Sequence, residues 1–281
     1  MSEGFAYSGV TASWATDAGG LCEVVLHREP LNELGEESLA ELERLVGALS
    51  GADELPARAL LVRSARPAGF CAGADLRALH QAIESRGHDA VARQLRTFLE
   101  RINAVFTVLD ESPVPSVAAL HGVVFGGGLE LALACDLRVA DRTARLALPE
   151  LRLGLIPGFG GLPRLRREVG AGRALDLLLT GRSLGAERAR EAGLVGQVVA
   201  PGKHVAAARR AAEQLARQDP AAVAAAKRHT KPSVREAVAA ELDTFCRLFA
   251  RPECARALAD FAGRRDPLPF LPAPREEEDR P

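Results

Sequence analysis

The chain has 281 residues, of which 36 are basic, 37 are acidic and 47% are apolar. This length allows one large domain with an appendage, and the apolar fraction is sufficient for an ordinary buried core. The near-neutral charge gives no support to nucleic acid or an anionic membrane surface as a partner.

Strand and helix patterns alternate over the first two thirds of the chain. Apolar spacing is the main signal, with glycine and proline marking the ends of elements. In chain order the patterns predict strand 21–27, helix 37–50, strand 57–64, a helical segment from Leu76 to about Asp110 with a break at 85–89, a strand within 113–122, helix 129–135, strand 136–141, helices 171–181 and 185–194, and strand 196–200.

The last third is predicted to be helical from Val205 to Gly263, with interruptions at 218–222, 230–233 and 250–253. Short buried strands joined by helices are typical of an α/β protein with mostly parallel pairing. We therefore predict an α/β core over 1–200, an all-helical region over 201–265, and a proline-rich, charged and disordered tail over 266–281.

Three consecutive glycines open the expected helix that carries Glu130, in the stretch FGGGLELALACD. The first amides of a helix are unpaired and carry partial positive charge, and glycine lets another molecule approach them. The run is therefore a candidate anion or oxyanion site. Because it lacks the lysine and hydroxyl of a P-loop and is not G-x-G-x-x-G, a developing oxyanion is favoured over phosphate.

A second small-residue turn, GFCAGADL, follows the expected strand 57–64 and includes Ala72, Gly73 and Ala74. Two backbone N–H groups from two such loops can form an oxyanion hole. Losing one donor of this kind typically raises a reaction barrier by roughly 3–4 kcal/mol.

Two glutamates lie beside glycine-rich turns: Glu130 follows the glycine run, and Glu150 stands in LPELRLGLIPGFGG. Taken singly, Glu130 could merely complement a helix dipole and Glu150 could be a capping acid exposed to water. Together in an apolar pocket, two carboxyls can separate their pKa values and act as acid and base.

The stretches FCAGADL, HGVVFGGGLELALACDLRVA and LPELRLGLIPGFGGLPRL, in this order and spacing, resemble the crotonase superfamily of enoyl-CoA hydratases and isomerases. The segments 26–46, 177–199 and 249–270 extend the resemblance, which covers about residues 20 to 270.

The resemblance implies a crotonase-like spiral of ββα units that holds an acyl-CoA site, followed by a C-terminal helical trimerisation region. It implies a homotrimer or a dimer of trimers. It also implies an acyl-CoA thioester substrate, no separate cofactor because coenzyme A is part of the substrate, and no metal. The thioester oxygen would accept hydrogen bonds from the amides of Ala74 and Gly127.

Hydratases of this family carry glutamate at both positions that match Glu130 and Glu150, whereas many isomerases keep only the second. The resemblance thus implies that Glu130 activates the water that attacks Cβ, and that Glu150 exchanges a proton with Cα. The substrate-binding positions that it implies are Ala72, at the adenine of coenzyme A, together with Gly73, Asp75, Leu76, Gly126 and Gly158.

Other reactions of the same enolate remain open: double-bond isomerisation, thioester hydrolysis and decarboxylation. A non-catalytic scaffold would leave the two acids unexplained. The chain departs from the family at 160–165, where GGLPRL replaces the frequent GGTQRL, and the segment between Asp75 and Pro115 is longer than usual. That segment either shapes the acyl pocket or forms a surface extension.

Several nearby residues have simpler interpretations. His121 and Cys71 are expected to be structural, while Arg63 and Arg66 could contact coenzyme A phosphates or remain surface charges. The five cysteines lack C-x-x-C spacing, which favours free thiols in a reducing compartment. With no secretory signal at the N-terminus and no apolar run of about 18 residues, the sequence predicts a cytoplasmic protein with no membrane partner.

Overall fold

The computed structural model describes residues 6–50 and 57–263. The predicted tail at 266–281 lies outside the described residues, and so do the last residues of the predicted helical region.

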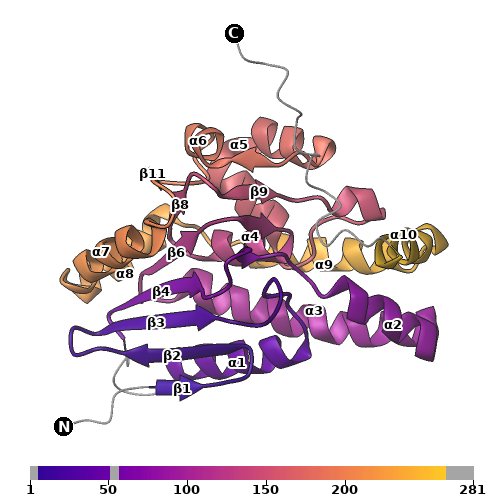
Figure 1. The fold of residues 1–281 in the computed structure, drawn as a ribbon, viewed down its shortest axis with the longest axis horizontal. Helices are drawn as coiled ribbons and strands as arrows, with labels where there is room; N and C mark the ends of the chain where they lie inside the picture. Colours follow the sequence, from indigo (N-terminus) through magenta and orange to yellow (C-terminus); the bar gives the residue numbers. More distant parts are fainter. Residues whose placement is uncertain (1–5, 51–56, 264–281) are drawn as a thin grey trace.

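The larger sheet has seven strands in the order β1-β2-β3-β4-β6-β8-β11 (Figure 1). β1 pairs with β2 and β2 with β3 in antiparallel fashion, and all later pairs are parallel. The predicted strands are all present, and the two antiparallel N-terminal strands are additional. Their bounds are β1 Ala6–Ser8, β2 Ala12–Thr16, β3 Leu21–Leu26, β4 Ala59–Ser64, β6 Ser116–Leu120, β8 Leu137–Asp141 and β11 Gln197–Val199.

A second sheet of four strands, in the order β10-β9-β7-β5, was not predicted. Its strands are β5 Gly69–Cys71, β7 Val123–Phe125, β9 Arg145–Ala147 and β10 Leu184–Gly185. Strands of two or three residues are too short to show an alternating pattern, which is why the sequence did not reveal them.

From β4 to β9 successive strands alternate between the two sheets, so that this part of the chain repeats a strand–strand–helix unit. β4 and β5 lead into α2 Leu76–Arg86, β6 and β7 into α4 Gly127–Ala134, and β8 and β9 into the short 3-10 helix η1 Glu150–Leu153 and then α5 Gly161–Thr180. β5, β7 and β9 are parallel neighbours. The turns that follow them therefore leave the second sheet at the same edge, and this places the three predicted motifs together.

The remaining helices of the core confirm the predicted periodicity, with one correction. α1 spans Glu36–Ser50 and α6 spans Ala186–Glu191. The predicted long helical segment is α2 followed by α3 His88–Glu111, and it breaks at Gly87, where φ is +82°. The helix predicted over 171–181 instead begins at Gly161 and is interrupted at Gly170.

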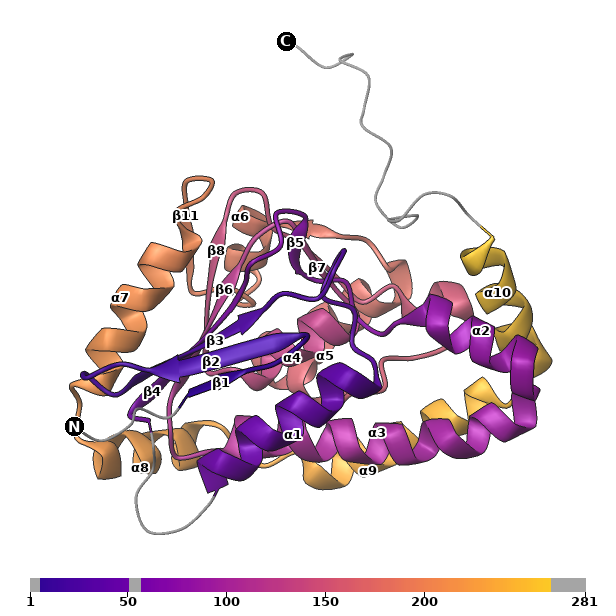
Figure 2. The same cartoon turned by 60° about the horizontal axis from the view of Figure 1, so that its bottom comes forward.

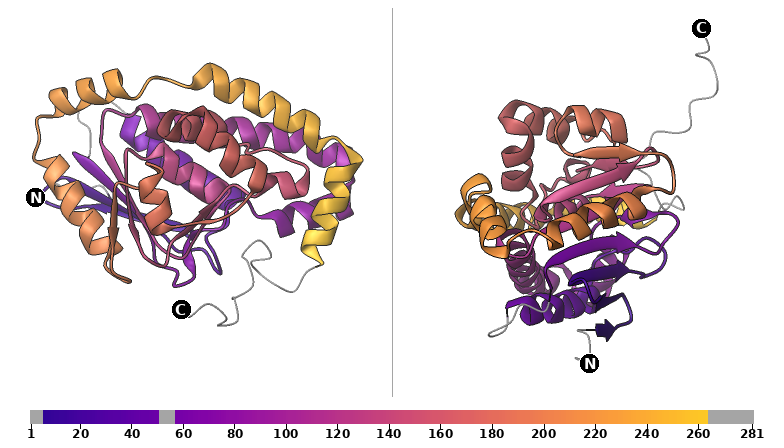
Figure 3. Two further views of the ribbon diagram at one scale, coloured as in Figure 1. Left: turned by 90° about the horizontal axis from the view of Figure 1, so that it is seen from above. Right: turned by 90° about the vertical axis from the view of Figure 1, so that its left-hand side faces the viewer.

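The C-terminal region consists of α7 His204–Ala216, α8 Pro220–Thr230, α9 Arg235–Phe249 and α10 Pro252–Ala262, as predicted. Alanines of α7 pack on one face of the larger sheet. α9 runs along α3, and α10 lies against α2 (Figures 2 and 3). α9 and α10 therefore cover the end of the core at which the three turns meet.

Candidate active site

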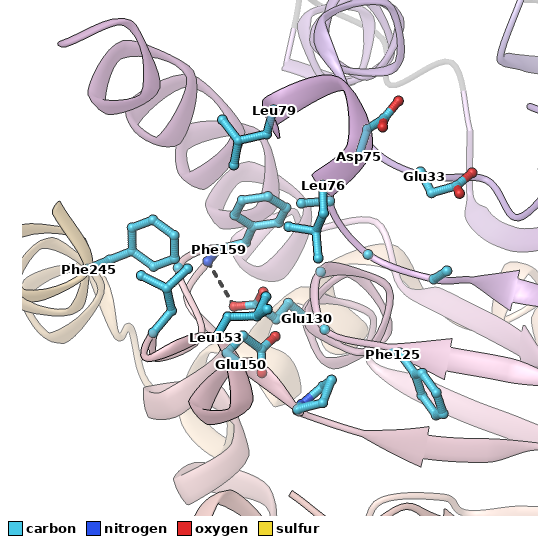
Figure 4. A pocket seen from close by; sticks show the side chains of 18 of the residues that line it. Glu33, Asp75, Leu76, Leu79, Phe125, Glu130, Glu150, Leu153, Phe159 and Phe245 are labelled. Atoms are coloured by element: carbon cyan, nitrogen blue, oxygen red, sulfur yellow. Dashed lines mark hydrogen bonds between the residues drawn. The ribbon is translucent and has the colours of Figure 1, made fainter. Parts of the chain in front are cut away.

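A pocket lies where the turns after β5, β7 and β9 meet the helices α2, α3, α9 and α10 (Figure 4). It encloses about 1080 Å³, including its open mouth. All predicted site residues line it, and they are Ala72, Gly73, Ala74, Asp75, Leu76, Gly126, Gly127, Glu130, Glu150 and Gly158. The structure thus brings together side chains from three successive repeats.

The two amides predicted to form an oxyanion hole lie on adjacent loops. A β-carbon at Gly73 would be 3.0 Å from the amide nitrogen of Gly127, so the two turns are in direct contact. Within residues 6–50 and 57–263, no acceptor takes a hydrogen bond from the amide of Ala74 or of Gly127. The amide of Gly127 belongs to the first turn of α4, where intrahelical partners are absent and the dipole is positive.

Glycine is required at both turns for steric reasons. Gly73 has φ +100° and Gly126 has φ +50°, and both values disfavour other residues. A β-carbon at Gly126 would also lie 2.9 Å from Oε1 of Glu150. The glycine run therefore allows one carboxyl group to approach the loop that carries the amide of Gly127.

Glu130 is 2% exposed and comes from the first turn of α4. Its Oε1 accepts hydrogen bonds from the amides of Phe159 and Gly161, both at 2.8 Å (Figure 4 shows the first). Those amides lead into and begin α5. The carboxylate of Glu130 therefore interacts with the N-terminus of a different helix, α5. Its role is not limited to complementing the dipole of its own helix, α4.

Glu150 begins η1, and its carboxyl group lies beside that of Glu130 (Figure 4). Its Oε2 is buried and has no hydrogen-bond partner among the described residues. The alternative of a capping acid exposed to water is thus wrong. Burial first, and then the negative charge of Glu130, raise the pKa of Glu150 well above its ordinary value.

The two carboxyl groups have different surroundings, and these affect their pKa values differently. Burial raises the pKa of Glu130 to about 7, while the amides of Phe159 and Gly161 and the charge of Arg164 oppose the rise. Glu150 has no comparable donors from other residues, so its protonated form is favoured further. The difference in donors favours an ionised Glu130, which can accept a proton, and a protonated Glu150, which can donate one.

One side of the pocket is apolar. Leu79 and Phe245 approach it from α2 and α9, and Leu153 from η1 (Figure 4). Further lining comes from Leu95, Phe98, Leu99, Leu155, Phe159 and Phe261. The long segment after Asp75 therefore shapes this pocket through α2 and α3.

Asp75 lines the pocket mainly as part of its wall. Its carboxylate caps α2 by accepting a hydrogen bond from the amide of Ala78 at 2.9 Å, and it pairs with Arg28 at 2.6 Å. In Figure 4 it lies at the end of the pocket away from Glu130 and Glu150. Gly158 lines the pocket where the ring of Phe245 approaches it too closely for a β-carbon.

The residues that were expected to be structural or surface charges do not line the pocket. The thiol of Cys71 is buried and donates to the carbonyl of Asn32 at 3.0 Å, and burial raises its pKa to about 12. His121 stacks on His204 with ring centroids 4.3 Å apart. Neither His121 nor the arginines at 63 and 66 line the pocket, and those arginines pair with Glu23 and Glu29.

Two buried charged residues beside the site were missed by the sequence analysis. Glu241, on α9, is 5% exposed and accepts hydrogen bonds from the amides of Gly160 and Leu162, both at 2.7 Å. Arg164 is fully buried and donates to Asp110 and to the carbonyl of Phe159. Glu241 had a sequence signal, because it interrupts the apolar face that α9 forms with Val238, Leu242, Phe245 and Phe249.

A double-layered spiral of strand–strand–helix repeats, with two amides that lack partners among the described residues and two neighbouring glutamates in one pocket, defines a protein of the crotonase type. The family model for enoyl-CoA hydratase/isomerase matches residues 16–268. The chain belongs to this family, and the expected crotonase-type enzyme is confirmed at that level.

Relatives agree with this assignment, and a solved structure agrees with the fold. The chain is 34% identical over 254 residues to a probable mitochondrial enoyl-CoA hydratase 2 of Arabidopsis thaliana, covering 89% of this chain and 81% of the relative. It is 38% identical to the mitochondrial methylglutaconyl-CoA hydratase of Rattus norvegicus, covering 70% of this chain and 60% of the relative. The fold is similar to that of an enoyl-CoA hydratase crystal structure from Bacillus halodurans, with a TM-score of 0.79, 23% identity, and coverage of 89% and 100% of the two chains.

In the part of the chain that the structure describes, no cluster of three or more His, Cys, Asp or Glu side chains is arranged for a metal ion. In the same residues no helix is both long enough and apolar enough to cross a membrane. The cytoplasmic location stays a prediction, and the two relatives above carry the word mitochondrial in their names.

Proposed function

We propose that the protein adds water reversibly across the α,β double bond of an acyl-CoA thioester. One observation carries the proposal: the buried Glu130 and the partly buried Glu150 lie in one pocket with the amides of Ala74 and Gly127, which have no partner among the described residues. A hydration of this kind needs an oxyanion site, a base for water and an acid for Cα, and we assign these roles to the four groups.

The different surroundings of the two glutamates support distinct roles. In the hydration direction, Glu130 takes a proton from water as the water oxygen bonds to Cβ. The electrons of the double bond move toward the thioester carbonyl, whose oxygen is stabilised by the amides of Ala74 and Gly127. Glu150 then donates its proton to Cα, and proton exchange between the two glutamates restores their starting states.

The lining of the pocket supports an uncharged, apolar acyl group. Arg77 is the single cation among the described lining residues, and it already donates to the carbonyl of Ala262 at 3.1 Å and lies over the ring of Phe261. The acids Glu33 and Asp75 would repel a second carboxylate. We therefore propose an acyl group without a second carboxylate, in place of the methylglutaconyl-CoA that appears in the name of the rat relative.

The proposed reaction and the family resemblance also indicate the cofactor requirement and the oligomeric state. Acid–base chemistry on a thioester needs no separate cofactor or metal, since coenzyme A arrives with the substrate. We propose a homotrimer or a dimer of trimers as the assembly, which sedimentation of the purified chain tests.

A spectrophotometric assay tests the reaction. The loss of enoyl-thioester absorbance is followed with trans-2-enoyl-CoA substrates of increasing chain length. Glu130→Gln and Glu150→Gln are each expected to lower kcat by about 10²–10⁴-fold, the usual contribution of an acid or base. Glu191→Gln, at an exposed acid away from the pocket, is the matched control.

Two results would contradict the hydratase assignment. The first is full turnover in either glutamine variant. The second is a wild-type enzyme that moves a double bond or hydrolyses the thioester without adding water, which would indicate one of the sister reactions of the same enolate.

A further inference from the structure

Four consecutive backbone amides at the start of α5 are shared alternately between two buried carboxylates. Those of Phe159 and Gly161 donate to Glu130, and those of Gly160 and Leu162 donate to Glu241. All four distances lie between 2.7 and 2.8 Å. Glu130 and Glu241 thus hold opposite sides of one short segment.

Other contacts fix the same segment from its carbonyl side. The amide group of Asn103, on α3, donates to the carbonyl of Gly158 at 2.8 Å. Arg164 donates to the carbonyls of Phe159 at 2.9 Å and Gly160 at 3.2 Å. The segment is therefore held from α3, α4, α5 and α9, and Glu241 supplies the only contacts to its amides that come from the C-terminal helices among the described residues.

Glu241 does not line the pocket, so it is not placed to touch a substrate. Its carboxylate is buried on the apolar face of α9, where a charged group is costly unless it is paired. Each of its oxygens accepts one amide hydrogen bond. This bidentate use of the carboxylate fixes the orientation of the segment that also carries the amides of Phe159 and Gly161.

We propose that Glu241 is a positioning residue for Glu130: from α9 it holds Gly160 and Leu162 so that the amides of Phe159 and Gly161 hold the catalytic carboxylate. This inference rests on the proposed role of Glu130 as the base. If one of the Glu241 contacts is lost, the segment rotates, and the acceptor position of Glu130 moves with the amides that it uses. A displacement near 1 Å at a reacting group can lower a rate by about 10²-fold.

A positioning role for Glu241 and a simple helix-capping role predict different results. A cap at Glu241 would protect only the two amides that it binds and would affect folding stability. A positioning role also ties the amides of Phe159 and Gly161, and the turnover number, to the carboxylate on α9.

The charged groups that face Glu241 predict a second measurable effect, which is a change in the pH dependence of kcat/KM. Glu130 on α4, Glu150 on η1 and Arg164 on α5 surround it, and Arg164 connects to Asp110 on α3. Burial first, and then the negative charge of Glu130, raise the pKa of Glu241 to about 8, and the charge that Glu241 carries above this pH contributes to the raised pKa of Glu150. Removing that charge lowers the pKa of the acid, and so the alkaline fall in kcat/KM is expected to move to lower pH.

The test compares the wild-type chain, Glu241→Gln, Glu241→Asp and Glu130→Gln, with Glu236→Gln as the control on an exposed position of the same helix. Steady-state kinetics on an enoyl-CoA substrate give kcat, KM and the pH profile. Hydrogen exchange followed by mass spectrometry counts the slowly exchanging amides within 158–165.

We expect Glu241→Gln to lower kcat by about 10²-fold while KM changes by less, and to shift the alkaline limb to lower pH. All four amides of residues 159–162 should then exchange faster. Glu241→Asp keeps the charge on a shorter side chain, so it should lower kcat while leaving the alkaline limb near its wild-type position.

The two proposals fail in different ways. If Glu130→Gln retains wild-type turnover, the proposed function is wrong. If Glu130→Gln is inactive but Glu241→Gln keeps its kcat and loses protection at no more than two amides, Glu241 is only a cap and the present inference is overturned.

Discussion

Replacing Glu130 by glutamine removes a buried charge and leaves its two main hydrogen bonds possible. Both amides that bind Glu130 donate to the same oxygen, Oε1, and a glutamine carbonyl can occupy that position. We therefore predict that Glu130→Gln, although inactive, is more stable than the wild type, and that the gain increases with pH.

The magnitude follows from the change in pKa between the folded and unfolded chain. Burial is the main cause of the raised value, which goes from 4.5 to about 7. Since the pKa is higher in the folded state, the wild type loses stability as pH rises through this interval. Linkage gives a destabilisation of about 1 kcal/mol at pH 5 that reaches about 3 kcal/mol at pH 8.5.

Urea unfolding at pH 5 and at pH 8.5, at one fixed protein concentration, measures the difference. The glutamine variant should gain about 2 kcal/mol more over the wild type at the higher pH. Glu191→Gln is a suitable control, because its exposed side chain should give the same small effect at both values. A gain that does not depend on pH, or a loss at pH 8.5, would refute the argument that Glu130 is a buried carboxylate held at a cost in stability.

Three further predictions concern the walls of the site. Gly126→Ala should lower kcat by about 10²-fold, because its β-carbon would lie 2.9 Å from Oε1 of Glu150; steady-state kinetics check this against Gly172→Ala, whose β-carbon meets nothing within 4 Å. Phe98→Ala should shift the preferred substrate toward longer enoyl chains, since this ring forms part of the apolar wall, and a chain-length series of kcat/KM values measures the shift. Iodoacetamide at pH 8 should leave Cys71 unmodified in the folded protein and alkylate it in urea, because burial raises its pKa to about 12, and peptide mass spectrometry reports the difference.

The parts of the fold that were predictable are those with long, regular apolar patterns. Strands such as Leu21–Leu26 and helices such as Glu36–Ser50 bury one face or two over several residues, so their spacing is visible in the sequence. The second sheet was missed because each of its strands contributes at most three residues, and because its pairings join segments far apart in the chain.

The start of α5 shows a different limit of prediction from the sequence. Gly160 and Gly161 suggested a turn, and the helix was predicted to begin only at residue 171. In the structure its first amides are satisfied by Glu130 and Glu241, which come from other helices. Local signals cannot reveal a cap that is supplied by residues tens of positions away, so propensity alone placed the boundary too late.

The candidate site was accessible from the sequence because its motifs are compact: each turn carries its glycine and its reactive group within a few residues. The sequence did not indicate which glutamate would keep its proton and which would ionise. That difference depends on the amides of Phe159 and Gly161, which reach Glu130, whereas Oε2 of Glu150 has no partner within the described residues.

The same contacts connect the chemistry to the architecture. The N-terminus of α5 has amides that need acceptors, and a buried carboxylate needs donors, so placing Glu130 there reduces both costs. The pKa of Glu150 rises because burial desolvates its carboxyl group and because it lies near this negative charge without receiving any of those donors. An acid and a base can therefore be distinguished with two identical side chains, because backbone geometry sets the difference between them. On this argument, variants that disturb residues 158–162 should alter the pH dependence of the reaction even when both glutamates are intact.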